Sequence, residues 1–167
     1  MTSLAHFCAD FWSWLENLPL AGHIGESWWF PLLESIHVLS ATFVLGTLLM
    51  VDLRLLGVAA RQQAVTRISG ELIPWSWGAF AVAVVTGSGM FITRAGTYME
   101  NPAFQIKLVL LALAGINMAA FHFGTFHRVA QWDMAATPTV AARFAGAASL
   151  LIWAGVMLAG RWVGHLQ

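Results

Sequence analysis

The sequence predicts an all-α integral membrane protein, a four-helix bundle preceded by an N-terminal amphipathic interfacial helix. Hydrophobic residues make up 59% of the 167-residue chain and charged residues only 10%, whereas a soluble domain carries about a quarter charged residues. Four long apolar runs occupy most of the chain, and each spanning helix needs about 20 apolar residues. Residues 1–167 are therefore predicted to form a single transmembrane domain.

The predicted spans cover about residues 30–53, 74–94, 104–127 and 141–163. Pro31 and Pro74 stand near the starts of the first two spans, where a helix tolerates a residue without a backbone N–H. The tryptophans beside both prolines are typical of the bilayer interface. Only short loops remain between these spans, so the chain has no room for a separate catalytic domain.

The N-terminal stretch differs from the spans. Residues 3–18 are too short and too charged to cross a bilayer, since Asp10 and Glu16 interrupt them. Their apolar residues crowd one side of a helix, which is typical of a helix that lies on the membrane surface. Residues 21–27 are expected to form a loop.

Basic residues predict how the chain is oriented. The loops after the first and third spans share one side and hold five of them, namely Arg54, Arg61, Arg67, Arg128 and Arg143. The opposite side holds three, namely Arg94, Lys107 and Arg161. Because basic loops stay in the cytoplasm, both termini are predicted to face outward, which is the periplasm in a bacterium.

Ionisable side chains inside the spans are the functional candidates, because a polar group in hydrocarbon is costly. Glu34 and His37 lie three residues apart on one face of the first span, and His122 lies toward the end of the third. Neutral histidine is a common ligand of haem iron and copper. We therefore predict a cofactor role for His37 and His122, with Glu34 tuning the charge near His37. The alternative is that the histidines only form hydrogen bonds between helices.

Depth limits which ligands can act together. His37 precedes the middle of its span and His122 follows the middle of its own, which separates them by about 13 Å along the membrane normal. One iron between them is therefore disfavoured. Met90 and Met157 are predicted within about a turn of the depth of His37, and thioether sulfur with histidine suits haem iron or Cu(I). The alternative for both methionines is packing alone.

The other charged residues near the spans favour structural roles. Asp52 and Arg54 are expected to anchor the end of the first span to headgroups or to pair with the facing loop, rather than to serve a quinone or a proton. Lys107 is expected to extend to the interface. The formal net charge is zero, and no basic patch for nucleic acid is present. No phosphate loop, nucleophile elbow, paired-cysteine motif or H-E-x-x-H pattern occurs, so an enzyme acting on a soluble substrate has little support.

Several segments together resemble a known family. They are residues 34–39 (ESIHVL), 51–57 (VDLRLLG), 74–78 (PWSWG), 86–87 (TG) and 101–108 (NPAFQIKL). Over about residues 28–127 the chain is similar to an uncharacterised family of small four-helix bacterial membrane proteins, and the resemblance implies a location in the inner membrane. More loosely, it is similar to the copper-resistance D family and to four-helix b-type cytochromes, although it lacks the latter's paired histidines at matched depths.

These observations favour a membrane redox module. The leading prediction is a protein, or a subunit of a larger membrane complex, that binds haem b through His37 and His122 and transfers electrons. A copper-handling protein that uses His37, Met90 and Met157 is the second prediction, and a cofactor-free accessory subunit is the third. In each case the expected partners are the lipid bilayer and either other subunits or further copies of the chain.

Overall fold

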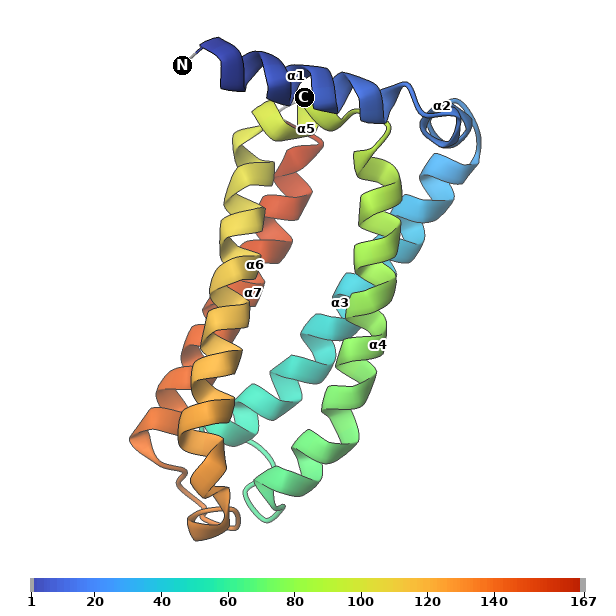
Figure 1. The fold of residues 1–167 in the computed structure, drawn as a ribbon. Helices are drawn as coiled ribbons and strands as arrows, with labels where there is room; N and C mark the ends of the chain where they lie inside the picture. The colour runs from blue at the N-terminus through green and yellow to red at the C-terminus, as the bar shows by residue number, and fades with distance from the viewer. Residues whose placement is uncertain (1, 166–167) are drawn as a thin grey trace.

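The computed structural model describes residues 2–165, with side chains from residue 9 onward, and this part of the chain is helical and has no strand. Four helices are long and apolar enough to cross a membrane. They are α3 (Trp29–Leu55), α4 (Val65–Phe91), α6 (Pro102–Ala120) with its continuation to Gln131, and α7 (Val140–Val163). They run side by side as one bundle (Figure 1). The predicted membrane-spanning four-helix bundle is confirmed.

The bundle consists of two helix pairs joined along one side. α3 packs along α4, α6 packs along α7, and α3 also crosses α7. At this crossing Gly146 lies against the backbone of α3. A Cβ atom at this position would come within 3.1 Å of the Asp52 carbonyl oxygen, so the close approach requires glycine. By contrast, the backbones of α4 and α6 do not pack along each other. Phe91 of α4 stacks on Phe104 of α6 near the start of α6, with ring centroids 5.6 Å apart. The side between α4 and α6 is therefore the loosely packed side of the bundle.

The two chain ends lie at the same end of the bundle, which we call the termini end (Figure 1). There α1 (Thr2–Glu16) lies across the ends of the spans, above α5 (Ala95–Glu100). The Glu16 carboxylate accepts a hydrogen bond of 2.8 Å from the backbone N–H of Gly96. Trp12 packs edge-on against Phe91 of α4, with ring centroids 5.8 Å apart. The N-terminal helix thus lies across the bundle, as predicted for an interfacial helix.

A short helix, α2 (Pro19–Gly25), joins α1 to α3 where the sequence predicted a loop, so that prediction was wrong. Pro19 occupies its first turn, where a missing N–H costs nothing. Ala21 and Ile24 are buried three residues apart on one face. Tertiary packing stabilises this helix, which is too short to show a clear periodicity in the sequence.

The predicted start of the second span was also wrong. α4 begins at Val65, so Pro74 lies inside the helix rather than in its first turn, and α4 ends at Phe91 rather than at residue 94. The first turn of α4 is capped from the opposite loop. The Asp133 carboxylate accepts hydrogen bonds from the backbone N–H of Thr66 at 2.8 Å and from its hydroxyl at 2.6 Å. A cap from so far along the chain leaves no signal in the local sequence.

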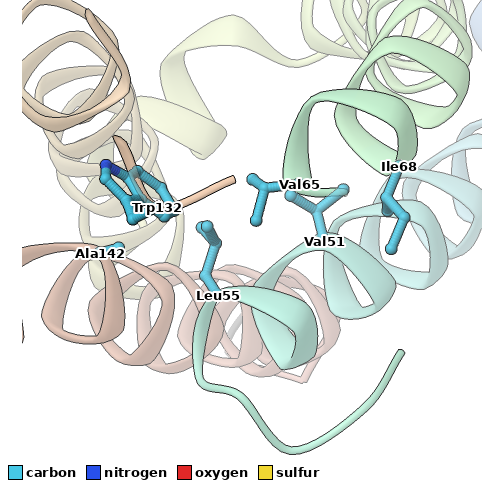
Figure 2. Close-up of a cluster of buried hydrophobic side chains, with 6 residues drawn as sticks. All are labelled: Val51, Leu55, Val65, Ile68, Trp132 and Ala142. Carbon is cyan, nitrogen blue, oxygen red and sulfur yellow. The ribbon is translucent and has the colours of Figure 1, made fainter. Parts of the chain in front are cut away.

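The opposite end of the bundle, which we call the loop end, contains a buried apolar cluster. Figure 2 shows its six members, namely Val51, Leu55, Val65, Ile68, Trp132 and Ala142. They come from α3, α4, α7 and the loop before α7. Burial of these side chains holds the start of α4 against α3 and explains why the helix begins before Pro74, at Val65.

Arg54 connects the loops at this end. Its side chain is 0% exposed, and its guanidinium donates hydrogen bonds to the carbonyl oxygens of Gln63, Asp133 and Ala135 at 2.8, 3.0 and 3.1 Å. Arg54 was predicted either to anchor the helix end to lipid headgroups or to pair with the facing loop, and the structure shows pairing with the loop. Gly57 follows with a φ of 72°, which turns the chain out of α3.

Candidate ligand-binding site between the helices

A cavity of about 190 Å³ lies among the four spanning helices, in the half of the bundle toward the loop end. Its walls come from the second half of α3, the middle of α4, the second half of α6 with its continuation, and the first half of α7. The cavity is only partly enclosed. Because the backbones of α4 and α6 do not pack along each other, we infer that its open side lies between these two helices.

Most of the cavity wall is apolar and aromatic. Phe80 of α4 packs edge-on against Trp77, with ring centroids 6.0 Å apart, and against Trp153 of α7 at 6.3 Å. All three rings line the cavity. Gly115 of α6 lines it too, and a Cβ atom there would meet nothing within 4 Å. The site can therefore accept a flat apolar group without displacing a side chain.

Two of the polar residues in the wall have protein partners. The Ser76 hydroxyl forms a hydrogen bond of 2.6 Å with the Thr47 hydroxyl. The Asn117 amide donates to the Ala145 carbonyl oxygen of α7 at 3.1 Å. These bonds hold α3 to α4 and α6 to α7, respectively. Ser76 and Asn117 are thus explained by packing between the helices.

Asp52 differs from these residues. Its side chain lines the cavity and is only 4% exposed. Ser149 of α7 forms a hydrogen bond with the carboxyl group, but the Oδ2 atom is buried and has no hydrogen-bond partner among the described residues. A buried carboxylate oxygen without a partner is costly. Asp52 therefore has an unused hydrogen-bonding capacity at the edge of an apolar cavity.

His122 lies on the same cavity wall. The regular part of α6 ends at Ala120, and His122 belongs to a π-helical turn, η1 (Phe121–Thr125), followed by the 3₁₀ turn η2 (Phe126–Gln131). Such π turns are frequent at functional sites. The imidazole stacks on Phe126 with centroids 4.9 Å apart, and neither ring nitrogen forms a hydrogen bond within the described part of the chain. This predicted site residue is free to bind a ligand.

His37 lies elsewhere, in a closed contact toward the termini end. Its Nδ1 is 2.8 Å from the Ala83 carbonyl oxygen and 3.3 Å from the Thr86 hydroxyl. Since a carbonyl oxygen only accepts, Nδ1 carries the proton and donates it. The other nitrogen, Nε2, then accepts from the Lys107 ammonium at 3.4 Å. The ring also fills the space beside Gly87, where a Cβ atom would lie 3.0 Å from its Cε1.

The contact between His37 and Lys107 revises two predictions. Lys107 turns toward the interior of the bundle rather than extending to the interface. His37 is therefore level with the start of α6, and His122 follows Lys107 by 15 residues. At 1.5 Å per residue the two histidines lie about 22 Å apart along the bundle, rather than 13 Å. The value of 13 Å depended on the midpoints of the first and third spans, and their boundaries had been placed from the sequence alone.

The remaining predicted site residues do not join either cluster. Glu34 is exposed and makes no hydrogen bond or ion pair among the described residues. Met90 and Met157 are half-buried, and neither sulfur is hydrogen-bonded to His37. In the part of the chain that the structure describes, no group of three His, Cys, Asp or Glu side chains is placed to hold a metal ion. The metal at His37 stays a prediction, and a metal at Nε2 would lie beside the Lys107 ammonium.

Comparison with known protein families identifies a family that covers nearly the whole chain. The family model of DUF6644, a family of unknown function, matches residues 11–166. The chain belongs to this family, which confirms the resemblance to an uncharacterised family. No curated protein and no solved structure matches the chain. The looser similarity to the copper-resistance D family and to b-type cytochromes has no support.

Proposed function

We propose that this protein binds a small, lipid-soluble ring compound in the cavity among its helices, as part of a membrane redox module. The observation that carries the proposal is Asp52, a buried carboxyl group on the wall of a mostly apolar cavity, with one oxygen that has no partner among the described residues. Ligand sites are commonly apolar pockets with a few convergent polar groups. Asp52 and His122 are those groups here.

The size and the opening of the cavity support a compound with one ring. A dry cavity of about 150 Å³ binds benzene, and this cavity of about 190 Å³ is slightly larger. An apolar tail on the ring would leave through the open side, between α4 and α6. A compound dissolved in the bilayer could thus reach the site without passing through water.

The test uses decylubiquinone, whose ring quenches nearby tryptophan fluorescence, with Trp77 and Trp153 as the reporters in the wall. Quenching should saturate in the wild-type protein and be lost in Gly115→Phe, which fills the cavity. Gly78→Phe is the matched control, since a side chain at Gly78 also meets nothing within 4 Å but does not line the cavity. Equal quenching in both variants would show that the ring binds elsewhere.

Haem b is the second candidate for the redox module, favoured by the free imidazole of His122. A porphyrin is much larger than a single ring, so it needs α4 and α6 to move apart. Reduction of purified protein with dithionite should then produce a Soret band and a sharp α band. Because His37 and His122 are about 22 Å apart, His37→Ala and His122→Ala should act additively. Loss of all haem in either folded variant would mean that the two histidines share one iron.

Copper handling and a cofactor-free accessory role remain the other predictions. Copper held by His37, Met90 and Met157 should be detected at about one atom per chain by elemental analysis. It should decrease in Met90→Leu and Met157→Leu, because soft sulfur ligands favour Cu(I). Purified protein with neither haem nor copper, and without a bound ring compound, would support an accessory subunit in a complex or a homo-oligomer.

The proposed location is the bacterial inner membrane with both termini in the periplasm. The excess of arginine at the loop end, in the loops and in the adjoining helix ends, supports this orientation. Alkaline phosphatase fused after Gln167 should be active. Fluorescence from green fluorescent protein fused at the same position would instead indicate that the C-terminus lies in the cytoplasm.

A further inference from the structure

We propose that the compound in the cavity carries a ring hydroxyl group, as a phenol or a quinol does, and that this hydroxyl donates a hydrogen bond to Asp52. The inference rests on the proposed ligand site and names the chemistry of its ligand. It begins from Oδ2 of Asp52, a buried polar atom in the wall for which the described residues supply no hydrogen-bond partner.

The unpartnered atom determines what the ligand must supply. When the Asp52 carboxyl group is ionised, its oxygens only accept hydrogen bonds, so a ligand with only carbonyl or ether oxygens cannot satisfy Oδ2. A hydroxyl group can, and a hydrogen bond to a charged acceptor is among the stronger ones. Ser149 already donates to the same carboxyl group. The ligand therefore completes a hydrogen-bonding arrangement that the helices leave half made.

A neutral donor suits the site better than a cation does. An ammonium or guanidinium group would lose its water shell against this largely apolar and aromatic wall, and that loss costs more than the desolvation of a neutral hydroxyl group. The aromatic wall formed by Trp77, Phe80 and Trp153 offers edges and faces for a flat ring beside the carboxyl group.

The experiment compares two probes of nearly the same shape, 4-nonylphenol and its methyl ether 4-nonylanisole, as competitors of decylubiquinone in the quenching assay. The phenol should displace decylubiquinone at about a tenfold lower concentration than the ether. That preference should vanish in Asp52→Leu and persist in Glu34→Gln, a control on the same helix whose carboxyl group is exposed. If Asp52→Leu does not fold, Asp52→Asn should still reduce the preference severalfold.

The outcomes separate this inference from the proposed function. If decylubiquinone binds in the cavity but the phenol and ether compete equally, or the preference survives in Asp52→Leu, the hydroxyl inference is wrong and the ligand site stands. Stronger competition by dodecylamine than by 4-nonylphenol would overturn it in favour of a cation. The unfolding temperature of the protein is also measured with 4-nonylphenol and with 4-nonylanisole. If decylubiquinone does not bind, a larger increase with the phenol than with the ether still shows a preference for the hydroxyl group. Displacement by decylubiquinol at a lower concentration than by 4-nonylphenol would favour a quinol as the ligand that carries the hydroxyl group.

Discussion

His37 and Asp52 lie 15 residues apart on the same spanning helix, yet their surroundings are opposite. Both ring nitrogens of His37 have partners, from α4 on one side and from Lys107 of α6 on the other. Asp52 is more deeply buried, but one of its carboxyl oxygens has no partner among the residues that the structure describes. His37 thus connects α3 to α4 and α6, whereas Asp52 retains an oxygen that a ligand could bind.

Two glycines show the same contrast in shape. Beside His37, the space next to Gly87 is filled by the imidazole ring. Beside the cavity, the space next to Gly115 is empty to at least 4 Å. An ionisable residue within a span is thus insufficient to mark a functional site. A missing partner together with unfilled space is the more specific sign.

The largest effect is expected from filling the space beside His37. Gly87→Val would bring a Cβ atom to about 3.0 Å from the imidazole, and such overpacking costs about 1–3 kcal/mol. The free energy of unfolding, measured by SDS titration in mixed micelles, should fall by that amount. Gly78→Val, at an open position on the same helix, controls for the intrinsic cost of valine in a helix. Equal losses in the two variants would mean that His37 is not packed tightly against α4.

Removing each polar group gives the second test of the comparison. His37→Ala leaves the Lys107 ammonium without its partner and should destabilise the protein by about 1–2 kcal/mol. Asp52→Asn removes a buried charge that lacks one partner, and it should leave stability unchanged or raise it. The same SDS titration measures both variants. A larger loss in Asp52→Asn than in His37→Ala would show that Asp52 is structural and would remove the basis for the ligand site.

The spans could be predicted from the sequence because long apolar runs have one main explanation in a chain with so few charges. The details that were missed depend on distant residues. The first turn of α4 needs Asp133 as its cap, and α2 needs its buried face. Neither contact is encoded near the helix that it stabilises.

The candidate site was half predicted for a similar reason. His122 was identified as an isolated histidine near the end of a span, and it lines the cavity. Asp52 was assigned to anchoring because it stands beside Arg54 at the end of an apolar run. The structure separates these neighbours, since Arg54 binds the loops while Asp52 faces α7 and lines the cavity. The position of an acidic residue near a span end does not reveal which side of the helix meets a cavity.

The smallest expected effect comes from Asp133, a carboxylate at the loop end that, unlike Asp52, is fully engaged. Burial acts to raise the pKa of Asp133, but hydrogen bonds from Thr66 and Val65 and the nearby Arg54 charge outweigh it and hold the pKa below the ordinary value of 3.8. A carboxyl group with a lowered pKa stabilises the folded state fully above its ordinary pKa, and this stabilisation is lost as the pH falls through the lower value. Unfolding temperatures in detergent should therefore fall slightly more steeply below about pH 4 in the wild-type protein than in Asp133→Asn. The same slope in both proteins would mean that the cap of α4 does not depend on the Asp133 charge. Asp133 could then not serve as the fully hydrogen-bonded carboxylate with which Asp52 is compared.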